Sequence, residues 1–131
     1  MSQQNVEIVR RAYVAFNRRD VDALDELTDP GWVMDWSRSI GPQQGVYRGR
    51  EGVTAWIAAI QEAFESFVVS PLEYIDSGSR IVVPTHVKGK GRGSGAGAEA
   101  QGTTLWELRD GKVVKMTLYQ SRQEALEAAS M

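Results

Sequence analysis

Residues 103–119 read TTLWELRDGKVVKMTLY, and this stretch decides the fold that the rest of the chain must complete. The Asp-Gly pair at 110–111 stands between two runs in which apolar and polar residues alternate, which is a strong signal for a β-hairpin. Because successive side chains of a strand point to opposite faces, the alternation also predicts the register. We expect one face to point toward the core and the other away from it: Trp106 and Met116 inward, Glu107 and Lys115 outward.

Apolar periodicity predicts the elements around this hairpin. Helical spacing predicts helices at 2–20, 21–28 and 51–66, and a capping box at Ser121 and Glu124 begins a last helix at 122–129. Runs with strand character lie at 32–37, 67–76, 80–93, 98–109 and 112–120. The order α-α-β-α-β-β-β-β-α indicates one α+β domain over 1–131. Its helices are expected to pack on one face of a curved, mostly antiparallel sheet.

Glycine occupies every second position from 89 to 97, in GKGRGSGAG. A phosphate-binding loop would need a Gly-x-Gly-x-x-Gly or Walker pattern followed by a helix, and the stretch has neither. The spacing predicts two strands that meet at a turn and leave one face bare of side chains. In the alternative interpretation, this bare edge lets another backbone or a ligand approach closely.

Composition excludes several classes of function. The chain has 131 residues, of which 42% are hydrophobic and 24% charged, as in ordinary globular domains. Its net charge of −2 implies no general attraction to nucleic acid or to an anionic membrane. The absence of cysteine excludes disulfides and thiolate metal sites, and a single histidine among scattered carboxylates gives no metal-ligand spacing. We expect no cofactor and, since no signal core or membrane-spanning run is evident, a cytoplasmic protein.

Three polar residues stand in apolar strand segments. Asp35 stands between Met34 and Trp36. In one interpretation its side chain is hydrogen-bonded to solvent or to a backbone amide. In the other, apolar neighbours raise the pKa of its carboxyl group, so that it accepts protons near neutral pH. His86, the only histidine, is either a structural or exposed residue, or a functional one that donates to a developing oxyanion or acts as the acid opposite Asp35. Gln120 is either a strand end in solvent or a group that orients a substrate carbonyl.

Large aromatic residues can line a cavity as well as fill a core. Tyr13, Phe16, Trp56 and Trp106 are each of a type found more often in cores than in sites. Together, however, the aromatic residues of a small domain with a bent sheet can enclose a sizeable apolar cavity.

The last strands also predict an assembly. Val113, Thr117 and Tyr119 are expected on the face opposite Met116, where they would expose apolar surface. A sheet face of this kind predicts a homodimer formed through the sheet.

Several phrases of the sequence resemble a known family over nearly the whole chain: IVRRAYVAFNRRDVDAL, YRGREGV, GRGSG, LRDGKV and RQEALEAA. They look like the nuclear transport factor 2-like superfamily, in its SnoaL-like, polyketide-cyclase branch that is common in bacteria. The resemblance implies a cone in which a strongly bent sheet wraps around helices and encloses a deep pocket, and it implies frequent dimers. Members include isomerases, cyclases, epoxide hydrolases, dehydratases and proteins with no known activity, so the resemblance implies a pocket and not a reaction.

Ketosteroid isomerase is the informative relative. It resembles this chain at Asn17 and Asp20 and around residues 111–114, and on these anchors its general-base aspartate falls on Asp35. The resemblance therefore implies that Asp35 is a proton acceptor with a raised pKa.

The other polar groups of that enzyme are not matched. Its oxyanion-hole tyrosine falls on Ala12, beside Tyr13, and its protonated aspartate falls on Thr104. A threonine hydroxyl can donate a hydrogen bond but is a much weaker acid, which argues against steroid isomerase activity.

Two hypotheses follow. In the first, the chain is an enzyme or binder for a small hydrophobic molecule, in which Asp35 acts as base on a carbonyl compound or water and His86, Gln120 or Thr104 as donor. The remaining pocket residues are then Tyr13, Phe16, Trp36, Trp56, Trp106 and Met116. In the second, the chain is a non-catalytic dimeric binding or interaction module whose sheet surface carries the function.

Overall fold

The computed structural model describes residues 2–39, 44–93 and 95–131, which form four helices and seven strands. The helices are α1 (Ser2–Arg18), α2 (Val21–Leu27), α3 (Gly49–Ala63) and α4 (Arg122–Ala129). The strands are β1 (Thr28–Asp35), β2 (Val46–Arg48), β3 (Phe64–Pro71), β4 (Ile75–Ser77), β5 (Arg80–Gly91), β6 (Gly97–Arg109) and β7 (Lys112–Tyr119).

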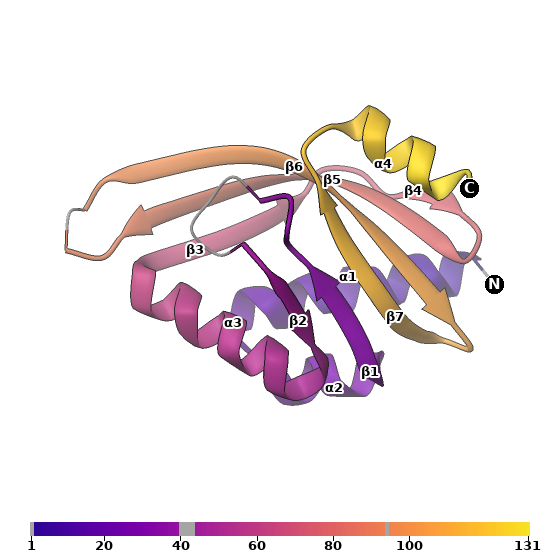
Figure 1. The fold of residues 1–131 in the computed structure, drawn as a ribbon, viewed down its shortest axis with the longest axis horizontal. Coiled ribbons are helices and arrows are strands. Elements are labelled where there is room, and N and C mark those ends of the chain that lie inside the picture. The colour runs from indigo at the N-terminus through magenta and orange to yellow at the C-terminus, as the bar shows by residue number, and fades with distance from the viewer. Residues whose placement is uncertain (1, 40–43, 94) are drawn as a thin grey trace.

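The strands form one curved sheet in the order β2-β1-β7-β6-β5-β3, with β4 paired to β5. Every pair is antiparallel except β1 with β7, which is parallel. Helices α1, α2 and α3 pack against the inner face of the sheet, and α4 packs against its outer face (Figure 1). The predicted α+β class and the bent, mostly antiparallel sheet around the helices are confirmed.

Two strands of the sheet were not predicted from the sequence. Strands β2 and β4 each have three residues, which is too short for a periodic pattern. The predicted strand over 67–76 is in fact divided. Strand β3 ends at Pro71, and the chain then returns as β4 to form a separate tight hairpin with the start of β5.

The β6–β7 hairpin has the register that the alternation predicts. Trp106 pairs with Met116, and both side chains are buried in the main core. Glu107 pairs with Lys115 on the opposite face, where Lys115 is exposed. The predicted orientation of these four side chains is confirmed, so the inner and outer faces of the late strands are known.

Beyond Glu107 the pairing shifts by one residue, so that Leu108 lies opposite Val113. The shift turns Val113 into the main core, where it is 0% exposed. Thr117 is 3% exposed, and Tyr119 is half-buried against a small apolar cluster that includes α4. The expectation that these residues form an exposed apolar stripe is therefore wrong. The homodimer itself stays a prediction.

Local sequence signals explain where the helices begin. Asp20 caps α2 by accepting a hydrogen bond from the backbone N–H of Ala23 at 3.0 Å. Ser121 caps α4 by accepting from the backbone N–H of Glu124 at 3.1 Å, which confirms the first half of the predicted capping box.

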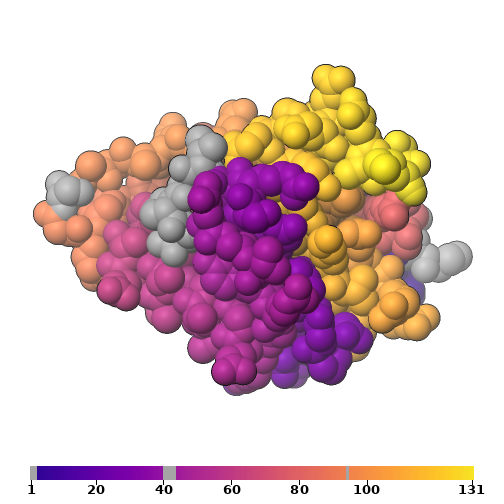
Figure 2. All heavy atoms as spheres, viewed as in Figure 1, coloured from indigo at the N-terminus to yellow at the C-terminus, as the bar shows by residue number. Residues whose placement is uncertain are grey.

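The β5–β6 hairpin extends beyond the body of the molecule. In Figure 2 its end projects past α3, while side chains fill most of the space that separates the ribbons of Figure 1. The alternating glycines lie in this extension, where β5 and β6 meet at a turn. The two-strand interpretation of the glycine pattern is confirmed.

Candidate functional site

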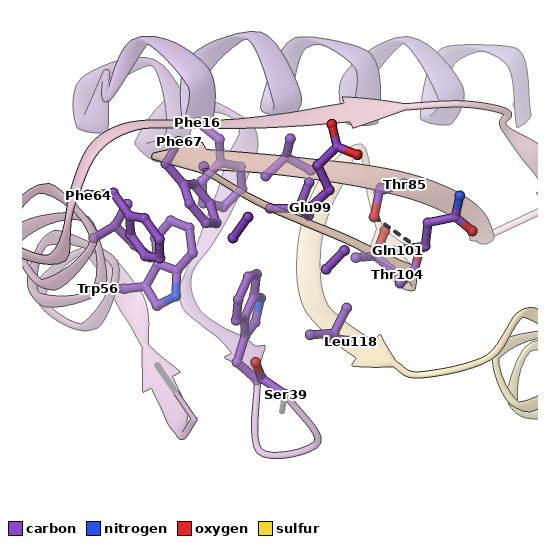
Figure 3. A pocket seen from close by; sticks show the side chains of 18 of the residues that line it. Phe16, Ser39, Trp56, Phe64, Phe67, Thr85, Glu99, Gln101, Thr104 and Leu118 are labelled. Atoms are coloured by element: carbon purple, nitrogen blue, oxygen red, sulfur yellow. Dashed lines mark hydrogen bonds between the residues drawn. The ribbon is translucent and has the colours of Figure 1, made fainter. Parts of the chain in front are cut away.

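A cavity of about 220 Å³ lies between the inner face of the sheet and helices α1 and α3 (Figure 3). Its walls come from α1, α3, β3, β5, β6 and β7 and from the segment that follows β1. Nearly all of the lining atoms are apolar. Because a dry cavity of about 150 Å³ can accept benzene, this cavity has room for an apolar molecule of one or two rings.

Aromatic side chains form one end of the cavity, where Trp56, Phe64 and Phe67 gather in Figure 3. The ring of Trp56 lies edge-to-face against Phe16, Trp36 and Phe67, with centroid distances of 5.6, 5.0 and 6.1 Å. The rings of Phe64 and Phe67 are 5.1 Å apart. Such contacts fix the orientation of each ring, so this end is a preformed aromatic wall.

The wall on β5 and β6 consists partly of glycine and alanine. Gly89 pairs with Ala98, and Gly102 lies further along β6 on the same inner face. A Cβ atom at Gly89 would lie 3.1 Å from Cδ1 of Phe64, and one at Gly102 would lie 3.0 Å from Cδ1 of Leu118. Larger residues would push these neighbours into the cavity, so the glycines keep it open.

Three hydroxyl and indole groups form a closed network beside the cavity. The Oγ1 of Thr104 donates to the carbonyl of Val83 at 3.2 Å, so the hydroxyl of Tyr13, at 2.6 Å, is the donor to Thr104. Nε1 of Trp106 donates to Oγ1 of Thr104 at 2.9 Å and to the hydroxyl of Tyr13 at 3.2 Å. Burial raises the pKa of Tyr13 well above its ordinary value, against the smaller opposing effect of these hydrogen bonds. Tyr13 therefore stays protonated, and each hydrogen of the network has an acceptor.

Two buried indole groups of the cavity wall are not paired in this way. Nε1 of Trp36 and Nε1 of Trp56 are both buried, and neither finds a hydrogen-bond acceptor among the residues that the structure describes. Both tryptophans line the cavity, and Trp56 is 2% exposed. Unpaired buried donors are uncommon in folded proteins because they have lost their hydrogen bonds to water.

Asp35 does not line the cavity. It is the last residue of β1 and lies on the opposite face from Met34, whose side chain is in the main core. Its Oδ1 accepts from the backbone N–H of Ser37 at 3.0 Å and from the hydroxyl of Ser37 at 2.6 Å, and Nη1 of Arg38 is 3.7 Å from Oδ2. Partial burial alone would raise the pKa of Asp35, but the hydrogen bonds from Ser37 and the charges of Arg38 and Lys115 hold it below its ordinary value.

The expectation that Asp35 faces the pocket with a raised pKa is therefore wrong. Asp35 forms a local turn with its own backbone two residues later, which stabilises the ionised carboxylate. A carboxylate stabilised in this way is a weaker proton acceptor, and its position keeps it from a molecule in the cavity.

His86 also lies on the outer face. Its neighbours Thr85 and Val87 line the cavity, so the alternation of β5 turns His86 the other way. Its Nε2 is 3.9 Å from Oε2 of Glu99, and its side chain is 35% exposed. His86 does share a face with Val82 as predicted, but this face is the outer one, and the expectation that it points into the pocket is wrong.

Among the described residues, no group of three or more His, Asp or Glu side chains is arranged to hold a metal ion. Within the same residues, no helix has the length and apolar character needed to cross a bilayer.

Comparison with known proteins now identifies the family. A family model described as the SnoaL-like domain matches residues 9–116. The chain belongs to the SnoaL-like family. The predicted resemblance is thereby confirmed. No curated protein matches the sequence significantly.

Solved structures share the fold of this SnoaL-like domain. An NTF2-like protein of unknown function from Burkholderia pseudomallei is 24% identical, with a TM-score of 0.78 and coverage of 98% of both chains. A candidate SnoaL-like polyketide cyclase from Jannaschia sp. CCS1 is 25% identical, with a TM-score of 0.77 over 98% of this chain and 93% of that one. TerC, co-crystallised with polyporic acid, is 22% identical, with a TM-score of 0.76 over 98% of this chain and 99% of that one.

Most of the side chains expected to bind substrate do surround the cavity of this SnoaL-like domain; Trp106 is the exception. Trp106 lies in the core behind Tyr13, where its ring centroid is 5.4 Å from that of Tyr13. Gln120 lines the cavity, and its Nε2 donates to the carbonyl of Arg38 at 2.6 Å. Tyr13, which follows the position where the oxyanion-hole tyrosine of ketosteroid isomerase falls, contacts Thr104, the position where its protonated aspartate falls.

Other cavity residues were not predicted from the sequence. Phe67 and Val69 of β3 and Thr85 and Val87 of β5 all line the cavity. Their signal was present, because Phe67 and Val69 share one strand face, and Thr85 and Val87 continue the face of the buried residue Val83.

Proposed function

We propose that this SnoaL-like domain binds a small apolar molecule in the cavity between α1, α3 and the sheet. The observation that carries the proposal is the pairing of a preformed aromatic wall with a wall of glycine and alanine that leaves the space between them open. A site that buries an apolar ligand between rigid walls obtains its affinity from removal of apolar surface from water.

Binding is a better-supported function than general-base catalysis. Asp35 and His86, the two groups expected to transfer protons, both lie on the outer face of the sheet. Within the part of the chain that the structure describes, Glu99 is the one acidic residue that lines the cavity. Its carboxylate shares the outer face with His86, so a base inside the cavity has no support.

A related structure is consistent with this role. TerC has been co-crystallised with polyporic acid, which supports the idea that this fold accommodates small organic molecules. A similarity of 22% identity supports a shared fold and nothing more, so the ligand class of this chain must be argued from its own residues.

Indane, a neutral bicyclic hydrocarbon, tests the proposal by calorimetric titration. We expect saturable binding of one indane to the wild-type chain. Ala100→Phe should abolish it, because Ala100 lines the cavity opposite Val87 and a phenyl ring there would occupy the space. Lys88→Phe is the matched control, since this substitution adds the same ring at an exposed position on the outer face of the hairpin. Binding that is absent from the wild type, or that survives in Ala100→Phe, would overturn the proposal.

A further inference from the structure

The backbone of β6 forms an open strand edge beside the cavity. The last residues that pair β6 with β7 are Thr103 and Tyr119, whereas β6 itself begins at Gly97. We propose that the ligand is a neutral, mostly apolar ring compound with an N–H next to a C=O, such as a lactam, and that these two groups pair with the backbone C=O and N–H of Gln101. The inference rests on the proposed binding function and specifies the class of the ligand.

The hydrogen bonds of the β5–β6 ladder determine which backbone groups of this edge point outward. The backbone N–H of Leu108 donates to the carbonyl of Ser79 at 2.8 Å, and that of Gly91 donates to the carbonyl of Ala96 at 2.9 Å. The register between these two bonds is continuous, and in an antiparallel pair the residues that bond to the partner strand alternate with residues that face away from it. Even-numbered residues of β6 therefore bond to β5. The odd-numbered residues, Gln101 included, present their N–H and C=O on the other side.

Gln101 lies beyond the point where β7 leaves the sheet. A longer β6–β7 ladder would pair Gln101 with Ser121, but Ser121 instead caps α4 by accepting from the backbone N–H of Glu124. Within the described residues, no hydrogen bond joins the outward N–H or C=O of Gln101 to another group. Gln101 is also exposed. Its two outward backbone groups can therefore pair with a ligand.

A second edge of the sheet, at β3, is covered by side chains. Asn17 of α1 pairs with both backbone groups of Val69: its Nδ2 donates to the carbonyl at 2.9 Å, and its Oδ1 accepts from the N–H at 3.0 Å. Nη2 of Arg19 donates to the carbonyl of Phe67 at 2.7 Å. Open strand edges invite unwanted pairing, and proteins usually block them. The contrast between a blocked edge at β3 and an open edge at Gln101 supports a binding role for the open one.

The open edge borders the cavity. Five consecutive residues of β6, 98–102, line it. Because successive side chains alternate between faces, those of Glu99 and Gln101 lie on the outer face with His86, so these two residues reach the cavity through their backbone. In Figure 3 the carboxylate of Glu99 points away from Leu118, which lies across the cavity. A ring bound in the cavity can therefore direct a polar edge at the backbone of Gln101.

The backbone groups of a single residue define the chemistry of the ligand. Gln101 offers one donor and one acceptor on the same side, so a complementary molecule needs an acceptor next to a donor, as in the cyclic amide of a lactam. No lysine or arginine is present among the described residues that line the cavity, so a carboxylate there would lack a counter-ion. Since an unpaired charge is very costly to bury, the cavity favours a neutral molecule.

Three bicyclic compounds of similar size test the inference by calorimetric titration of the wild-type chain: indane has no polar group, 2-indanone adds a carbonyl, and oxindole adds an N–H beside it. We expect each step to tighten binding roughly fivefold, the ratio that one additional hydrogen bond provides. In ¹H–¹⁵N NMR spectra, oxindole should move the backbone amide signal of Gln101 downfield, beyond the change that indane causes. The amide of Ala100, which bonds to β5, is the internal control.

Two variants at one position separate the backbone from the side chain. Gln101→Pro removes an N–H that points away from β5, and proline is tolerated at such edge positions because no ladder hydrogen bond is lost. This variant should lose the preference for 2-indanone over indane. Gln101→Ala is the matched control, because it removes the same side chain from the outer face but keeps the N–H, and it should bind all three compounds like the wild type. If the proline variant does not fold, the titrations and spectra of the wild-type chain decide.

The outcomes separate the two proposals. Saturable binding of indane without a preference for oxindole, or an unshifted Gln101 amide at saturating oxindole, would overturn the inference and leave the binding function standing. Slow hydrogen exchange at the Gln101 amide of the free chain would also overturn it, because another group would then already cover the edge. If none of the three compounds binds, the proposed function and the inference both fail.

Discussion

The closed network of Tyr13, Thr104 and Trp106 makes a quantitative prediction for Thr104→Val. Valine has nearly the shape of threonine, so the change removes one hydroxyl from a side chain that is 3% exposed. It removes the acceptor of the Tyr13 hydroxyl and the donor to the carbonyl of Val83, whereas Nε1 of Trp106 keeps the Tyr13 oxygen at 3.2 Å. With the bond from Nε1 of Trp106 to Oγ1 of Thr104, the protein therefore loses three buried hydrogen bonds, and the O–H of Tyr13 is left without a partner.

The expected cost follows from these losses. Leaving one buried donor unpaired costs about 1–3 kcal/mol, and valine recovers part of this through its extra apolar surface, so we expect a destabilisation of about 2 kcal/mol. Urea unfolding monitored by circular dichroism measures it as a lower midpoint with an unchanged slope. In a thermal scan the same loss corresponds to a fall in Tm of about 6–10 °C.

Two further variants make this test specific. Thr103→Val is the control, because Thr103 is the preceding residue of β6, is 4% exposed and points to the outer face. The double variant Tyr13→Phe, Thr104→Val removes both hydroxyls and should cost less than the sum of the single changes, by about 1 kcal/mol or more. A Thr104→Val protein as stable as Thr103→Val, or additive single changes, would refute the closed network.

Three further predictions follow from the fold. Asp35→Ala should cost about 1 kcal/mol at neutral pH by removing the acceptor of Ser37. Because the pKa of Asp35 in the folded protein lies below its ordinary value of 3.8, this contribution is present above that pH and is lost as the pH falls below it, so acid unfolding of wild type and variant should converge. Gly102→Ala should weaken indane binding by about 1 kcal/mol, roughly fivefold, because its Cβ would displace Leu118 into the cavity; Gly97→Ala, in open space, should not change binding, and equal effects would contradict the argument. The homodimer stays a prediction that light scattering checks, and a mass of 14.5 kDa at tens of micromolar would contradict it.

The sequence predicted the fold well where periodicity and turn chemistry agree. The Asp-Gly pair at 110–111 gave the hairpin, and the alternation gave the inward direction of Trp106 and Met116. The one-residue shift beyond Glu107 leaves no trace in a pattern of alternating residues. This shift is the reason that Val113 is in the core and not on the surface.

The aromatic part of the cavity was predictable for a physical reason. Phe16 and Trp56 lie at helical spacing on the apolar stripes of α1 and α3, so a sheet wrapped around these helices must meet them. The directions of the polar side chains were harder to predict. Both faces of β1 carry apolar residues, so alternation could not decide the direction of Asp35. The serine at position 37 was a signal for the turn that holds this carboxylate.

His86 was misplaced because β5 is buried on both sides. Val82 packs beneath α4, while Ile81 and Val83 pack in the main core, so the strand has no polar face to mark the outside. Thr85 and Val87 share a face with Val83, and the register with β6 together with the burial of Val83 in the main core identifies that face as the inner one.

The central claim, that the cavity binds a small apolar molecule, is tested most directly by isotope-filtered NOE spectra of the ¹³C-labelled chain with unlabelled indane. The account predicts contacts from the protons of indane to the methyl groups of Met116 and Leu118, which line the cavity. Contacts confined to Val68 and Leu72, which are exposed on the surface, would contradict it, as would the absence of any contact at saturating indane.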